Sequence, residues 1–188
     1  MRHCKIYSCI GFLIFILISG CASNSYNMIV GGDYNEDRNK TEYFVVPFGS
    51  VTIPGKWEKT DYNTASNQQF FKNDNGDSIA IAFGPCDKYE FNINNSCKGW
   101  DFVIAYYEWD SLYFVNKHGL NREVIEENRS NNYIIWRVYG DKHGSEFDVY
   151  MLIGENNCRV NNYSVQTSTK WPKEEKVSFL KGLYLQQD

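Results

Sequence analysis

Histidine, proline and clustered basic residues are scarce in this sequence. Of 188 residues, 3 are histidine and 4 are proline, and the formal net charge is −4. No run of five basic residues occurs, and a phosphate backbone is recognised through clustered Lys and Arg, so no nucleic-acid partner is expected. Aromatic residues are abundant, with 14 Tyr, 12 Phe and 5 Trp, and this composition favours strands.

Short motifs that carry catalysis or metal binding are also missing. The sequence has no His-Glu-x-x-His, Gly-x-Ser-x-Gly, Cys-x-x-Cys or glycine-rich phosphate loop. His118 and His143 each lie in Lys-His-Gly between expected elements, which is typical of exposed turns. Glu126 and Glu127 would point to opposite faces of a strand and not converge. We therefore expect no catalytic residue, metal or cofactor from a local motif, and only a site assembled from distant residues stays open.

The first 21 residues combine three features in a fixed order. Arg2 and Lys5 form a cationic start, residues 10–18 are an apolar run, and two small residues then precede Cys21. This order resembles the lipobox signal peptide of bacterial lipoproteins, in which a diacylglycerol is attached to the cysteine sulfur and the chain is cleaved before it. The resemblance implies lipidation of Cys21.

A lipidated Cys21 would hold the protein on a membrane through its acyl chains. The apolar run is too short for a transmembrane helix, which needs about 20 apolar residues. Loss of the signal peptide, residues 1–20, removes two basic residues and no acidic ones, which changes the formal net charge from −4 to −6. Ala22 resembles, in Gram-negative cells, a signal for sorting to the outer membrane. We expect a membrane-anchored cell-envelope lipoprotein; an ordinary cleaved signal that does not use the cysteine is the alternative.

Three cysteines remain in the chain after Cys21. Cys86 and Cys97 flank a loop of ten residues between a strand-like and a helix-like segment. We predict a disulfide between these two, which would contribute about 3 kcal/mol. Cys158 would then be left over. The alternative is that all three are small buried hydrophobic residues, and connectivity cannot be read from sequence.

The mature chain divides into a linker and one domain. Residues 21–42 are polar, contain glycine and show no periodicity, so we expect a lipidated N-terminus followed by a flexible linker. Residues 43–188 have the size of a single domain. Asn75 and Gly76 lie between two β-rich runs and predict a hairpin with a type I′ turn, in which both residues have positive φ.

The expected elements of this domain are eight strands and two helices. Residues 99–117 predict a helix that ends at Gly119, and residues 172–185 predict a second helix that begins near a proline. The strand-like runs are residues 43–48, 51–53, 67–73, 78–83, 120–127, 132–140, 146–153 and 159–167.

The runs at residues 132–140 and 146–153 are apolar on both faces. A sheet with one wet face would show polar residues at every second position, so these strands predict a sheet that is covered on both sides. The expected fold class is α+β, a mostly antiparallel sheet covered by helices in an α/β/α sandwich. The stretch Val-Thr-Ile-Pro-Gly-Lys-Trp at residues 51–57, the Asn75-Gly76 hairpin and the order of elements resemble the PsbP-like sandwich over about residues 43–185. The resemblance implies a role in binding or assembly, because this fold serves binding and assembly more often than catalysis.

The helix at residues 99–117 carries two apolar stripes on opposite sides. One must face the sheet. The first stripe consists of Trp100, Val103, Ile104, Tyr107 and Phe114. The second, a candidate aromatic binding stripe, consists of Phe102, Tyr106, Trp109 and Tyr113. We expect the second stripe to be covered by the last helix or a long loop; the alternative is an exposed platform for a protein or sugar.

Two functions of different kinds fit these features. The first is a lipid-anchored, non-enzymatic binding or assembly module of the cell envelope, with an envelope protein or a glycan as its partner. The second is an envelope enzyme that acts on glycan or another envelope substrate through residues distant in sequence. Converging titratable groups in a pocket would favour the enzyme.

Overall fold

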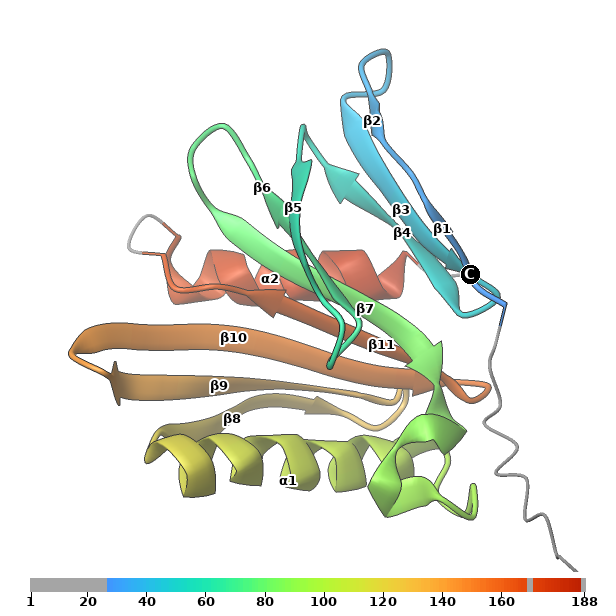
Figure 1. The fold of residues 1–188 in the computed structure, drawn as a ribbon, viewed down its shortest axis with the longest axis vertical. Helices are drawn as coiled ribbons and strands as arrows, with labels where there is room; N and C mark the ends of the chain where they lie inside the picture. Colours follow the sequence, from blue (N-terminus) through green and yellow to red (C-terminus); the bar gives the residue numbers. More distant parts are fainter. Residues whose placement is uncertain (1–26, 169–170, 187–188) are drawn as a thin grey trace, which may run out of the picture.

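A computed structural model describes residues 27–168 and 171–186 (Figure 1). The expected signal peptide and Cys21 lie outside the described residues. In the described part of the chain, no helix has both the length and the apolar character that crossing a bilayer requires.

The centre of the fold is a seven-stranded sheet in which all neighbouring strands are antiparallel. The strand order is β5-β6-β7-β11-β10-β9-β8. The strands are β5 (Glu58–Asn63), β6 (Gln68–Lys72), β7 (Ser78–Pro85), β8 (Asn121–Asn128), β9 (Tyr133–Lys142), β10 (Ser145–Asn156) and β11 (Arg159–Val165).

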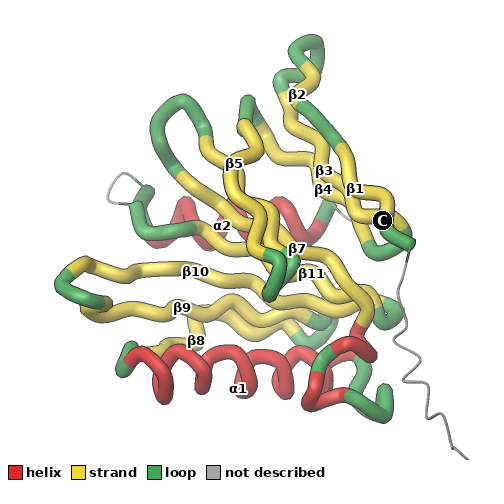
Figure 2. Tube along the Cα trace, viewed as in Figure 1, coloured by secondary structure: helices red, strands yellow, loops and turns green. Residues whose placement is uncertain are grey.

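Helices cover both faces of this sheet, as Figures 1 and 2 show. Helix α1 (Gly99–His118) packs on one face, together with the short 3-10 turns η1 (Cys86–Lys88) and η2 (Glu90–Asn92). Helix α2 (Lys173–Leu185) packs on the other face, beside a smaller sheet. The smaller sheet contains β1 (Ile29–Gly31), β2 (Tyr34–Asn35), β3 (Lys40–Val46) and β4 (Gly49–Pro54). The predicted fold class, an antiparallel sheet covered by helices, is confirmed.

The central strands contribute side chains to two separate cores. Ile135 and Leu152 belong to the core under α2 and the smaller sheet, whereas Trp136 and Ile153 belong to the core under α1. Successive side chains of a strand point to opposite faces, so the buried stretches of β9 and β10 must be apolar at successive positions. The sequence shows this pattern at residues 133–136 and 149–153, where both faces of the strands are buried.

Helix α1 ends where the sequence predicts. Gly119 adopts φ 65° and its N–H bonds to the carbonyls of Phe114 and Val115, a left-handed cap that favours glycine. Helix α2 begins directly after Pro172. Proline has no backbone N–H, so no unpaired donor is left at this position before the first turn. Both helix predictions are confirmed.

The predicted linker is too long at its C-terminal end. Ile29 pairs with Val46 and Tyr34 pairs with Thr41, so residues 29–31, 34–35 and 40–42 lie in strands of the smaller sheet. The short strands β1 and β2 pair with β3 and are ordered by that pairing. These segments are too short to show a strand periodicity in the sequence alone.

The turn at Asn75-Gly76 joins β6 to β7, but it is not of the predicted type. Gly76 adopts φ 86°, whereas Asn75 is not among the described residues with positive φ. The loop runs from Asn73 to Asp77, and the N–H of Asn73 bonds to the carbonyl of Asp77 at 3.1 Å. The hairpin is therefore present with a five-residue loop instead of a two-residue one.

The disulfide joins Cys86 to Cys158, and Cys97 is a free thiol, so the predicted Cys86–Cys97 bridge is wrong. Antiparallel pairing of β7 with β11 places Pro85 opposite Arg159, and the N–H of Cys86 bonds to the carbonyl of Cys158 at 3.0 Å. The register of two strands that are 72 residues apart at the bridge therefore selects the partner. Closeness in sequence gives no hint of that register.

Candidate functional site

The second stripe of α1 is divided between a covered and an exposed half. Phe102 and Tyr106 are buried, whereas Trp109 is 38% exposed and Tyr113 is 53% exposed. The cover is the segment that contains η1 and η2, since the rings of Tyr89 and Phe91 contact the buried half. The expectation of a long covering loop holds for half of the stripe, and the other half faces solvent.

The first stripe faces the sheet. Val103 and Tyr107 are buried, and the ring of Tyr107 lies 5.5 Å from that of Trp136 on β9. Phe114 lies 6.2 Å from the same indole. These contacts fix the rotation of α1 about its axis. The second stripe then lies to one side of the helix, where Tyr106 still reaches Asn162 on β11 and Trp109 and Tyr113 are exposed.

Trp109 is held in place at the boundary between the two halves. Its indole Nε1 donates a hydrogen bond to Oε1 of Glu90 at 2.6 Å. Its ring lies 5.6 Å from Tyr106 and 5.7 Å from Phe91. The indole is therefore fixed on one side by an aromatic cluster and open on the other.

Leu112 and Tyr113 extend this exposed region by one helical turn. Residues three and four positions apart are neighbours on a helix, so Trp109, Leu112 and Tyr113 form one surface, here called the α1 surface. Leu112 is also exposed. Contiguous exposed apolar side chains on a soluble domain mark interaction sites, and Tyr and Trp are enriched at such sites.

A carboxyl group lies next to the α1 surface. Burial raises the pKa of the Asp110 side chain to about 7. Burial also raises the pKa of Tyr106 well above its usual value, and the Tyr106 hydroxyl accepts a hydrogen bond from Nδ2 of Asn162 at 2.7 Å. A carboxyl that titrates near neutral pH can donate or accept a proton, which is the one property in this region that catalysis would need.

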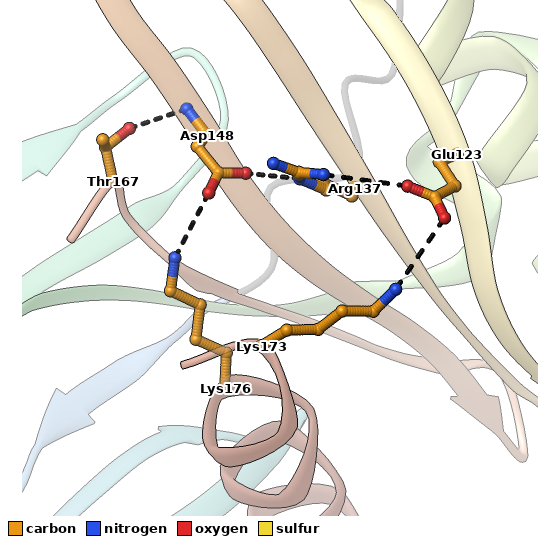
Figure 3. Close-up of polar contacts among 6 residues, drawn as sticks. All are labelled: Glu123, Arg137, Asp148, Thr167, Lys173 and Lys176. Carbon is orange, nitrogen blue, oxygen red and sulfur yellow. Dashed lines mark hydrogen bonds and ion pairs between the residues drawn. The ribbon is translucent and has the colours of Figure 1, made fainter. Parts of the chain in front are cut away.

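A network of charged residues lies on the opposite face of the sheet, under the start of α2 (Figure 3). Oδ1 of Asp148 lies 2.6 Å from Nε of Arg137, and Oδ2 lies 3.4 Å from Nζ of Lys176. Glu123 lies 3.8 Å from both Arg137 and Lys173. Each charge has an opposite neighbour, so this charged network fastens α2 to β8, β9 and β10 and offers no unpaired charge to a ligand.

The sequence analysis did not find this network. Its signal is that Arg137 and Asp148 are charged residues inside otherwise apolar strands. Residues so placed are paired when they are buried. In the antiparallel register, Arg137 lies opposite Tyr150, and Asp148 opposite Tyr139, so the two charges are diagonal neighbours.

A cleft of about 470 Å³ lies between two hairpins. The β3–β4 hairpin lines one side with Val46 and Pro47, and the β10–β11 hairpin lines the other with Asn156, Asn157 and Arg159. Neither Asp110 nor the α1 surface contributes to it. The carboxyl with the shifted pKa and this cleft are therefore separate features, which speaks against one shared catalytic pocket.

Within residues 27–168 and 171–186, no three His, Cys, Asp or Glu side chains come together in a way that would hold a metal ion. Cys97 is partly exposed beside the Cys86–Cys158 bridge, and its N–H donates to Oδ1 of Asn92 at 2.9 Å. The region around the bridge is thus ordered by amide side chains.

The described residues form an α+β fold with exposed aromatic side chains on α1. No protein-family model and no curated protein matches the sequence. Among solved structures, the chain is similar to cyanobacterial PsbP (CyanoP) from Synechocystis sp. PCC 6803, with a TM-score of 0.38 and 12% identity, over 86% of this chain and 93% of that one. This is the fold family that the order of elements resembles.

Proposed function

We propose that this chain is a lipid-anchored protein of the cell envelope that acts as a non-enzymatic binding or assembly module. The anchor is supported by the order of charge, apolar run and small residues before Cys21. Two acyl chains on one cysteine would keep the domain at the membrane surface. The domain would then meet its partner there.

The α1 surface is the proposed binding site. The observation that carries this proposal is the position of Trp109, whose indole is fixed by Glu90 and remains 38% exposed. An aromatic side chain that is already ordered loses little conformational entropy when a partner covers it. Tyr113 and Leu112 continue the same surface with no charged residue between them on that face.

Binding can be tested without knowing the partner in advance. The acylated protein would be presented to a panel of envelope glycans and, separately, cross-linked within envelope membranes. We expect Tyr113→Ala to lose the interaction while the fold is kept, because this side chain is 53% exposed. Tyr62→Ala is the matched control, since Tyr62 is 45% exposed on β5. Equal loss in both variants, or in neither, would contradict the α1 surface as the site.

The anchor has its own test. Cys21→Ala should leave an uncleaved precursor without acyl chains, because the thiol is the acceptor in the lipoprotein pathway that the sequence resembles. Mass spectrometry of the purified protein measures both changes. Mature protein that still partitions into detergent after this substitution would disprove the lipoprotein assignment.

An enzyme is retained as the second candidate because of Asp110. Its carboxyl, with a pKa near 7, could act as a general acid or base. If the protein acts on an envelope glycan, Asp110→Asn should abolish product formation and leave binding through Tyr113 intact. Product formation that survives this substitution removes the candidate.

A further inference from the structure

The described chain begins at an apolar edge of the smaller sheet. Four of the eleven large hydrophobic side chains that are exposed in the described residues gather here: Met28, Ile29, Val30 and Val46. They are between 47% and 66% exposed, and we call them the β1 edge. Ile29 is the cross-strand partner of Val46, so the four residues form one continuous edge.

The β1 edge is apolar on both of its faces. Ile29 and Val46 point to the same face as cross-strand partners, whereas Val30 points to the other. A sheet edge that packed on the domain would bury one of these faces. Val45, the cross-strand partner of Val30, is buried in the core, whereas the four residues of the β1 edge remain exposed beside it.

The cleft between the two hairpins lies directly beside this edge. Val46 belongs to both, and Arg159 is the single charged side chain among the described residues that line the cleft. Asn156, Asn157 and Asn161 add amide groups. Figure 1 shows the start of the described chain, the β3–β4 turn and the β10–β11 turn at the same end of the molecule.

The sequence limits how far this end can be from the membrane. Met28 lies seven positions after Cys21, with six residues between them. A fully extended chain of that length spans at most about 25 Å. An anchor at Cys21 therefore keeps the β1 edge close to the lipid headgroups, whatever path the intervening residues take.

We propose that the β1 edge and the cleft beside it rest on the lipid bilayer that holds the anchor. The apolar side chains enter the boundary between headgroups and acyl chains, and Arg159 contacts a lipid phosphate. This inference rests on the proposed lipid anchor and adds an orientation to it. The α1 surface, on the far side of the large sheet from the smaller sheet, then stays available to a partner.

A bilayer fits this edge better than a second copy of the chain does. Strand β1 has 3 residues, too few to pair stably with a strand of another molecule. The mature chain carries a net charge of −6, which an anionic bilayer repels. The apolar β1 edge and Arg159 can offset this repulsion at the end of the molecule that lies next to the anchor.

The experiment uses the acylated mature protein in vesicles of phosphatidylethanolamine and phosphatidylglycerol. Ile29→Trp and Val46→Trp place a fluorophore on the β1 edge, and Tyr62→Trp is the matched control on β5. Each variant is compared with the parent protein in vesicles with and without brominated lipids. Both edge positions are exposed, and retention of the parent melting temperature checks that each variant is folded.

We expect the added emission at positions 29 and 46 to shift to shorter wavelength and to be quenched by brominated lipids, with neither effect at position 62. Absence of quenching at both edge positions, or equal quenching at position 62, overturns the orientation. A chemical cross-link between the β1 edges of two molecules would identify a second copy of the chain as the occupant. That result would also overturn the proposed orientation. Mass spectrometry reports the acyl chains separately: their absence defeats the anchor itself, and this inference falls with it.

Discussion

Lys176 of α2 and Asp148 of β10 form an ion pair across the interface between helix and sheet, with Nζ 3.4 Å from Oδ2. The Lys176 side chain is only 3% exposed, so the pair is held away from most water. Arg137 contacts the other oxygen of Asp148 at 2.6 Å. The Asp148 carboxylate therefore neutralises two cations, Arg137 and Lys176. Loss of Asp148 and loss of Lys176 should then differ in their effect on stability.

Removal of the shared carboxylate should cost more than removal of either cation. Asp148→Ala leaves Arg137 and Lys176 without their main partner, and we expect the free energy of unfolding to fall by about 2–4 kcal/mol. Lys176→Met should cost about 1 kcal/mol or less, because Arg137 still neutralises Asp148 and the methionine fills similar space. Urea denaturation measures both.

Lys173→Met is the control for this pair of variants. Its side chain is 46% exposed and lies 3.8 Å from Glu123, so we expect a change within about 0.5 kcal/mol. Equal losses for Asp148→Ala and Lys176→Met would show that the carboxylate is not shared.

The disulfide should make a large contribution to stability. The bridge between Cys86 and Cys158 closes a loop across 72 positions, and a loop of this length corresponds to about 4 kcal/mol in the chain-entropy model. Cys158→Ser should lower the free energy of unfolding by about that amount, whereas Cys97→Ser should change it little. Mapping of peptides without reduction should find Cys86 linked to Cys158 and Cys97 open to alkylation.

These cysteines show what the sequence can and cannot predict. Local patterns gave both helices, because Gly119 and Pro172 act on their own turn of backbone. Local patterns also predicted a sheet covered on both faces, because burial on both faces requires a run of apolar residues in β9 and β10. The partner of Cys86 depends on the register of β7 against β11, which no local pattern encodes.

The candidate site was predictable only in part for the same reason. The stripe of Phe102, Tyr106, Trp109 and Tyr113 follows from helical periodicity. Its division into a buried and an exposed half depends on where Tyr89 and Phe91 fold back onto the helix. The shifted pKa of Asp110 depends on that same packing, so the sequence alone gave no reason to single this residue out.

Asp110 predicts a dependence of stability on pH. An Asp carboxyl in the unfolded chain titrates near pH 4, and burial raises the pKa of Asp110 in the fold to about 7. Between these values the folded state binds the extra proton, so the free energy of unfolding falls as pH rises from about 4 to about 7 and is constant above. The protonated carboxyl is thus the stabilising form.

Asp110→Asn should remove this dependence. A shift of three pKa units corresponds to about 4 kcal/mol, and since Asp110 retains some contact with solvent we expect about half of that. The variant should be more stable than the parent by about 2 kcal/mol at pH 8 and equal to it at pH 4. Asp61→Asn, on the exposed strand β5, is the control and should follow the parent curve at both pH values. Parallel curves for Asp110→Asn and the parent would contradict the shifted pKa.

Trp109 should show an energetic cost between those of a core residue and a surface residue. Trp109→Ala removes contacts with Tyr106 and Phe91 and the hydrogen bond to Glu90, yet 38% of the side chain is already exposed. We expect the free energy of unfolding to fall by about 1–2 kcal/mol, against about 3–5 kcal/mol for Phe102→Ala in the buried half.

Tyr113→Ala completes the series, with an expected change within about 0.5 kcal/mol because this side chain is 53% exposed. The order Phe102, Trp109, Tyr113 then follows the stripe from its covered end to its open end. A loss at Trp109 as large as that at Phe102 would mean that the indole belongs to the core, and the proposed binding surface would shrink to Leu112 and Tyr113. A binding defect in Trp109→Ala could then no longer be separated from loss of the fold, and Tyr113→Ala would carry the test alone.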